Sequence, residues 1–414
     1  MKSICLCFTV HQPVRLRKFR FFDIGNSAYY YNDYHNEFIL QRIAENCYLP
    51  ANKILLDQIQ KFKGRFKVSF SISGTAIDQF KLYAPEVLDS FKELAATGCV
   101  EFLSETYSHS LVSIRDKKEF RKQVEMHASE IETLFGMKPT AFSNTELIYS
   151  DEIGATVAGM GYKTVLTEGS NHILKWRSPN YVYQNSINPN LSVLLKNDRL
   201  SDDISFRFSN TKWVGWPLTA QKYVSWMTKI PGEEKIVNLF MDYETFGERQ
   251  KKDSGILDFL QSFPSVALRK SRLNFMTPSE VAANYEPVSV LNVPHPISWA
   301  DEERDLSAWL GNDLQREAFD NLYELLGLID HCTDADLLKD WRYLQTSDHF
   351  HYMSTKFFSD GAVHAYFSPY ESPYEAFLNY MNVLNDFSVR LNNLVTKNII
   401  KHIQPKNPGL RVEK

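Results

Sequence analysis

The sequence has few cysteines and no strong excess of charge of either sign. Its five cysteines form no CxxC pair and are irregularly spaced, so we expect apolar fillers in a reducing compartment, not a zinc site or a disulfide framework. The formal net charge is −4, and no Lys/Arg cluster of the kind that follows a phosphate backbone occurs. Nucleic acid is therefore not an expected partner.

Long apolar runs are missing as well. None approaches the about 20 residues that a membrane-spanning helix needs, so we expect no membrane partner. The N-terminal stretch MKSICLCFTVHQP has an apolar run of only about seven residues and no small-residue cleavage site, unlike a typical signal peptide. We interpret it as a first strand and predict a cytoplasmic protein.

Several catalytic signatures are absent from the sequence. It contains no GxSxG motif, no GxGxxG or GxxxxGK[ST] loop, and no HExxH or HxxxH pair. We therefore predict neither a cofactor nor a catalytic metal, although a metal-dependent deacetylase or mannosidase on a similar barrel stays an alternative. Aromatic residues, by contrast, are abundant at 14%, which indicates either a large aromatic core or stacking platforms for sugar rings.

Short apolar runs recur along the chain with helix-like segments between them. Buried strands that alternate with amphipathic helices indicate a parallel sheet, and seven repeats favour a closed barrel. After about residue 285 apolar residues recur at helical spacing with no clear strand. We predict an α/β fold, a distorted TIM-like (β/α)7 barrel over residues 1–290, followed by a C-terminal helical bundle over 291–405. The seven runs are 4–10, 67–73, 100–105, 140–145, 163–168, 192–197 and 236–241.

Polar, mostly ionisable residues follow each of these runs, at the strand ends from which catalytic groups of such barrels come. Glu146 in FSNTELIY and Asp242 in IVNLFMDYETFGE both directly follow apolar strand residues. Glycoside hydrolysis needs one carboxylic acid to protonate the leaving oxygen and a second carboxylate as nucleophile or base. Either residue alone is more commonly a cap or an ion-pair partner, but as a pair they are the best catalytic candidates. Glu244, two residues further on, either tunes Asp242 or forms a structural ion pair.

Five motifs together resemble glycoside hydrolase family 57, in its shorter α-amylase-type branch. The resemblance implies a (β/α)7 barrel whose active-site cleft is completed by a helical domain. It also implies cleavage or transfer of α-glucan chains, with retention of anomeric configuration and without a metal. The motifs are HQP at 11–13, FSNTELIY at 142–149, MDYETFGE at 241–248, SWADEERDLSAWLGND at 298–313 and LQTSDHF at 344–350.

The resemblance also implies roles for individual residues. Glu146 would be the nucleophile and Asp242 the general acid/base of a double displacement. For binding of the α-glucan or maltooligosaccharide substrate, the resemblance implies His11, Glu101, His109, Trp299 (by stacking) and Asp348, the last from the helical domain.

Two positions depart from the pattern of this branch. Ser143 stands where an Arg is usual, and Arg249 lies in an E-R-Q-K segment where a His- and Trp-bearing version is expected. Neither is one of the catalytic pair, so they bear on the substrate subsites and on the strength of the activity. The sequence predicts an α-amylase-like retaining hydrolase; a 4-α-glucanotransferase and a catalytically weak glucan-binding protein are the alternatives.

Overall fold

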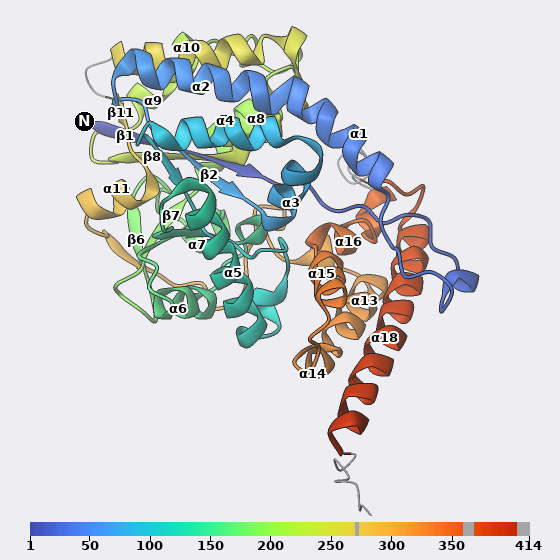
Figure 1. The fold of residues 1–414 in the computed structure, drawn as a ribbon. Helices are drawn as coiled ribbons and strands as arrows, with labels where there is room; N and C mark the ends of the chain where they lie inside the picture. The colour runs from blue at the N-terminus through green and yellow to red at the C-terminus, as the bar shows by residue number, and fades with distance from the viewer. Residues whose placement is uncertain (270–272, 359–367, 404–414) are drawn as a thin grey trace, which may run out of the picture. The chain divides into compact units, whose positions relative to one another are not determined.

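The structure is a computed structural model that describes residues 1–269, 273–358 and 368–403 and separates into two compact units (Figure 1). The first unit comprises Met1–Val14 and Asp33–Ala308, and the second comprises Arg15–Asn32 and the described residues from Trp309 onward. The predicted division into residues 1–290 and 291–405 stays a prediction. Among the described residues, no helix is long and apolar enough to cross a membrane.

Strand β1 (Lys2–Val10) lies inside one sheet of the first unit. It pairs in parallel with β8 (Ile236–Asp242) along one edge and with β2 (Val68–Ile72) along the other. On the β2 side, β3 (Val100–Phe102) extends the sheet, and β11 (Leu273–Phe275) pairs with the first residues of β1. Because every pairing is parallel, the carboxyl ends of these strands share one edge.

The second sheet has the strand order β12-β6-β7-β5-β4. All its pairings are parallel except that between β6 and β7, which is antiparallel. A separate two-stranded ladder joins β9 (Phe246–Gly247) to β10 (Gln250–Lys251). The strands of the second sheet are β4 (Ala141–Ser143), β5 (Thr164–Thr167), β6 (Val182–Asn185), β7 (Ser192–Leu195) and β12 (Ser289–Leu291).

The predicted α/β fold is confirmed, with a strand in each of the seven apolar runs. The hydrogen-bond ladder of a closed barrel is not confirmed, because the strands pair as two five-stranded sheets. Single contacts link the sheets: a bridge between Ser104 and Phe142, and the Asn197 N–H that donates to the Asn238 carbonyl over 2.9 Å. The prediction missed β6, β11 and β12, which have three or four residues each and lie outside the seven apolar runs.

Helices of the first unit follow most of the strands. Helix α5 is capped at both ends: the Asp116 carboxylate accepts the Glu119 N–H, and Gly136 ends the helix with φ of +70°. Helix α2 packs against α10 and α4 (Figure 1). The helices are α1 (Asp33–Ile43), α2 (Leu49–Phe62), α3 (Gly74–Tyr83), α4 (Pro85–Ala96), α5 (Lys117–Phe135), α6 (Asp151–Gly159), α7 (Asn171–Leu174), α8 (Asp198–Ser205), α9 (Ala220–Lys229), α10 (Ile256–Arg269) and α11 (Pro278–Asn284).

The second unit is helical wherever the structure describes regular elements in it. Its long helix α18 packs against α13, α14 and α15, and Trp341, Phe350 and Tyr380 are among its buried aromatic residues. Short helix α12 (Ser307–Leu310) spans the boundary between the units. The helices are α13 (Asp313–Tyr323), α14 (Leu326–Ile329), α15 (Ala335–Leu344), α16 (Ser347–His351) and α18 (Pro373–Ile403).

An aromatic cluster fixes the carboxyl end of β8. The ring of Tyr243 lies 4.9 Å from that of Phe8 and 5.1 Å from that of Phe70, centroid to centroid. Its hydroxyl donates to the Asn52 side-chain oxygen over 2.7 Å. Much of the high aromatic content therefore forms core, and part of that core anchors the residue next to Asp242.

The chain leaves this cluster through a turn that requires glycine. Gly247 has a φ of +121°, and a Cβ atom there would collide with the backbone carbonyl oxygen of Asn46. The turn is therefore pressed against the π-helical segment η2 (Ala44–Tyr48), and it carries the residues that follow Asp242.

We expect Gly247→Ala to lower the urea midpoint of unfolding more than Gly255→Ala. Gly255 also has positive φ, +81°, but open space around its Cα, so Ala there adds only backbone strain of about 1–2 kcal/mol. At Gly247 we expect the collision to add about 1–3 kcal/mol. Circular dichroism against urea measures both variants, and equal midpoints would contradict the close approach to Asn46.

Candidate active site

Glu146 stands in a strained turn directly after β4. The turn, η4 (Thr145–Leu147), holds Glu146 at φ +54° and ψ +28° and Leu147 at φ +52°. Non-glycine residues seldom adopt this left-handed conformation, which costs of order 1–3 kcal/mol and is found chiefly at functional sites. The Asn144 amide closes the turn by donating to the Ile148 carbonyl over 2.9 Å.

Two nitrogen atoms contact the Glu146 carboxylate. His109 Nε2 lies 3.2 Å from Oε1, and the indole Nε1–H of Trp299 donates to Oε2 over 2.5 Å. The Trp299 backbone N–H also donates to the Glu146 carbonyl, next to an antiparallel bridge between Tyr149 and Ile297. The Glu146 side chain retains 23% exposure, so this oriented carboxylate is still open to a ligand.

His109 lies buried between two carboxylates. Its Nδ1 is 2.9 Å from Glu105 Oε2, opposite the contact of its Nε2 with Glu146. Burial disfavours the charged ring, but the hydrogen bonds and charges of Glu105 and Glu146 outweigh it and raise the pKa of His109 to about 10. His109 is therefore an imidazolium at neutral pH, and it favours the ionised form of Glu146.

His11 completes this group from the end of β1. Its ring stacks on that of His109, with centroids 3.8 Å apart and planes 16° from parallel. Its Nδ1 lies 2.8 Å from the Ser73 hydroxyl, which also caps α3 by accepting the Ala76 N–H. Ser73 therefore ties His11 to a helix terminus.

Asp242, the last residue of β8, forms an ion pair with Arg249 and keeps 19% of its side chain exposed. Burial raises the pKa of its carboxyl, and the charge of Glu146 raises it further. Arg249, His109 and Lys196 act in the opposite direction without cancelling the rise. A carboxyl with a raised pKa suits proton donation.

Glu244 is a buried residue in the turn that follows Asp242. Its carboxylate accepts hydrogen bonds from the Tyr48 hydroxyl and, over 3.4 Å, from the Gln12 amide. Burial and the charge of Asp242 raise the pKa of Glu244 to about 7, against the hydrogen bond from Tyr48. These contacts show Asp242 acting on Glu244, and whether Glu244 in turn tunes Asp242 or forms a structural ion pair stays a prediction.

Three charged side chains, those of Lys196, Asp202 and Arg304, lie around Trp299 and Glu168. Lys196 Nζ lies 2.9 Å from Asp202 and 3.4 Å from the buried Glu168, and 5.5 Å from the Trp299 ring centroid. Arg304 lies 3.8 Å from Glu168 and donates to the Trp299 carbonyl. This network fixes the indole that contacts Glu146.

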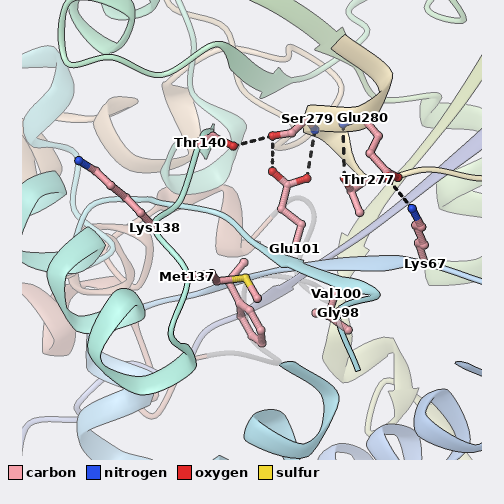
Figure 2. A pocket seen from close by; sticks show the side chains of 11 residues that line it. Lys67, Gly98, Val100, Glu101, Met137, Lys138, Thr140, Thr277, Ser279 and Glu280 are labelled. Atoms are coloured by element: carbon pink, nitrogen blue, oxygen red, sulfur yellow. Dashed lines mark hydrogen bonds and ion pairs between the residues drawn. The ribbon is translucent and has the colours of Figure 1, made fainter. Parts of the chain in front are cut away.

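Glu101 lies apart from this group. Its carboxylate accepts the backbone N–H of Ser279 over 3.0 Å and also the Ser279 hydroxyl, in a pocket of about 270 Å³ (Figure 2). Other residues lining that pocket, such as Lys67 and Thr140, precede strands β2 and β4. Glu101 therefore faces the amino ends of the strands, and its assignment to substrate binding stays a prediction that the geometry does not favour.

Asp348 lies in α16 of the second unit, where its backbone carbonyl accepts the Tyr352 N–H. Its contribution to the cleft stays a prediction. Within residues 1–269, 273–358 and 368–403, no group of three His, Cys, Asp or Glu side chains is arranged to hold a metal ion.

Comparison with known proteins bears on these residues. The model of glycosyl hydrolase family 57 matches residues 5–294. This range includes Glu146 and Asp242, whereas Trp299 and Arg304 lie beyond it. The chain belongs to this family. A relative from Methanocaldococcus jannaschii, named "Putative alpha-amylase", is 41% identical over 403 residues, covering 94% of this chain and 85% of the relative.

Solved structures of a GH57-type branching enzyme and of a 4-alpha-glucanotransferase share the fold. The branching enzyme from Pyrococcus horikoshii superposes with a TM-score of 0.70 at 14% identity, over 98% of this chain and 92% of that one. The 4-alpha-glucanotransferase from Thermococcus litoralis gives 0.58 at 16% identity, over 88% of this chain. The chain spans only 54% of that transferase.

The sequence interpretation of this family 57 site missed Glu105, Lys196 and Arg304 as partners. Glu105 had a usable signal, because it is the last residue of the 100–105 run and precedes His109 by four residues. Lys196 and Arg304 had none, since their contacts with Glu168 join segments that are distant in the sequence.

We expect Glu105→Gln to lower the pKa of His109 from about 10, because one of its two carboxylate partners loses its charge. Histidine labelled with 13C, with the His109 resonance assigned through His109→Asn, gives the titration midpoint by NMR. Glu152→Gln, an exposed carboxylate paired with Lys117, is the matched control and should leave the midpoint in place. An unchanged midpoint in Glu105→Gln would show that Glu105 does not stabilise the charged form of His109.

Proposed function

We propose that the protein is a retaining α-glucan hydrolase of the α-amylase type, with Glu146 as nucleophile and Asp242 as general acid/base. The main support for this proposal is that the two carboxyl groups have different hydrogen-bond partners and charged neighbours. Glu146 is held by an imidazolium and an indole N–H, whereas the pKa of Asp242 is raised by burial. Two carboxyls in such different environments divide into an ionised and a protonated one.

In the first displacement, the Glu146 carboxylate attacks the anomeric carbon and the glycosidic bond breaks, while Asp242 gives its proton to the leaving oxygen. His109 and Trp299 orient the attacking carboxylate. Once Glu146 is esterified, its negative charge no longer raises the pKa of Asp242. Asp242 then takes a proton from water as the water attacks the anomeric carbon and displaces the Glu146 carboxylate, which releases the sugar with retained configuration.

α-Glucans are the proposed substrate class because relatives are named for acting on them: the M. jannaschii relative as an amylase and the T. litoralis structure as a 4-alpha-glucanotransferase. Transfer differs from hydrolysis only in the acceptor, a sugar hydroxyl in place of water. A 4-α-glucanotransferase is therefore the second candidate function.

We expect Glu146→Gln and Asp242→Asn to reduce cleavage of maltooligosaccharides of defined length, Asp242→Asn by about 10²–10⁴-fold in kcat/KM. Asp89→Asn and Glu152→Gln, on the exposed surface, are the matched controls. Chromatography of the products separates the candidates: shorter products alone indicate a hydrolase, longer ones as well a transferase. Full activity of the two site variants would refute the assignment, and loss of wild-type activity with a chelator would favour a metal-dependent hydrolase.

Trp299, for which the family resemblance implies stacking on glucan, also donates its indole N–H to Glu146. Trp299→Phe keeps an aromatic ring but removes the N–H that contacts Glu146, so we expect kcat/KM to fall about 10-fold or more, as for loss of a hydrogen bond to a charged group. Trp226→Phe, at an aromatic contact in α9, serves as the control. Near-normal activity of Trp299→Phe together with a loss in Trp299→Ala would show that the ring, not the N–H, is what matters.

A further inference from the structure

The turn after β8 brings the chain back onto Asp242. The backbone N–H groups of Glu248 and Arg249 both donate to the Glu244 carbonyl, over 3.2 and 2.9 Å. The β9–β10 ladder and the close approach of Gly247 to Asn46 fix the same turn. The Cα of Arg249 is therefore held in a defined place relative to the end of β8.

From this position the Arg249 guanidinium reaches the Asp242 carboxylate. Nη2 contacts Oδ2, and the two side chains keep only 22% and 19% of their exposure. Solvent screens such a pair less than one on the open surface. The contact joins the one arginine of the E-R-Q-K segment to the proposed acid/base.

Charges on several elements face Asp242. Glu146 on η4 and Glu244, two residues further on, are the acidic groups, and His109, Lys196 and Arg249 are the basic ones. The direct partners of His109 are Glu105 and Glu146, and those of Lys196 are Glu168 and Asp202. Arg249 is the cation in direct contact with Asp242.

A guanidinium in that place favours the carboxylate over the carboxylic acid. The first displacement, however, needs the acid, because Asp242 must give its proton to the leaving oxygen as the glycosidic bond breaks. The pH at which Asp242 loses this proton limits kcat/KM on the alkaline side.

We propose that Arg249 is a positioning residue that, through its ion pair with Asp242, sets the alkaline limit of glycosidic bond cleavage. The inference rests on the proposed function for its catalytic meaning, but the ion pair itself is measurable without turnover. It also predicts dependence on the leaving group. A maltooligosyl fluoride releases fluoride with little need of a proton, so its first displacement bypasses the group that Arg249 controls.

The test compares Arg249→Gln and Arg249→Lys with the control Arg207→Gln, which removes the partner of Asp203 over 2.7 Å. Aspartate labelled with 13C at the side-chain carboxyl, with Asp242 assigned through Asp242→Asn, gives the titration midpoint by NMR. We expect the midpoint to rise by about one to three pH units in Arg249→Gln, as for loss of an adjacent opposite charge. Arg249→Lys should stay near wild type, and Arg207→Gln should match it.

The alkaline limb of kcat/KM on a maltooligosaccharide should move upward by the same amount in Arg249→Gln, and the limb on a maltooligosyl fluoride should not move. An unchanged or lowered midpoint in Arg249→Gln, or an Arg249→Lys that behaves like Arg249→Gln, would overturn the inference. If Arg249→Gln fails to fold, Arg249→Met takes its place with the same expectations. Full glucan cleavage by Asp242→Asn would instead refute the proposed function, while the NMR midpoints would still decide whether Arg249 controls Asp242.

Discussion

The buried imidazolium of His109 is the interaction on which the proposed site depends. Glu105 contacts one ring nitrogen and Glu146 the other, and together they overcome the cost of burying the charge. The contact favours the ionised Glu146 and aims it from a left-handed backbone conformation that is otherwise unfavourable. Trp299 holds the second carboxylate oxygen, so the orientation does not rest on one bond.

The same charges shape the setting of Asp242. It ends a buried strand anchored by the aromatic cluster around Tyr243, which keeps its carboxyl partly dry and rigidly placed. Glu146 and burial favour the protonated form, and Arg249 opposes them. The pKa of Asp242 is therefore set by opposing neighbours, and in the proposed mechanism it falls when Glu146 loses its charge in the covalent intermediate.

Sequence periodicity predicted the α/β class and the location of seven strands, because each buried strand is a short apolar run followed by polar residues. It missed short strands such as β11, and it could not show that the ladder divides into two sheets, since pairing is non-local. Glu146 and Asp242 were readable from their places after strands. The indole contact of Trp299 and the ion pair of Arg249 were not, because both depend on how distant turns fold back onto the site.

In the proposed mechanism Glu146 forms a covalent bond to the sugar. Incubation with a 5-fluoro-α-maltooligosyl fluoride, which slows release of the intermediate, followed by proteolysis and mass spectrometry, tests it most directly. We expect one glycosylated peptide, the one that contains Glu146, and no labelled peptide in Glu146→Gln. A label on another carboxylate, or a first product of inverted configuration by NMR, would contradict it.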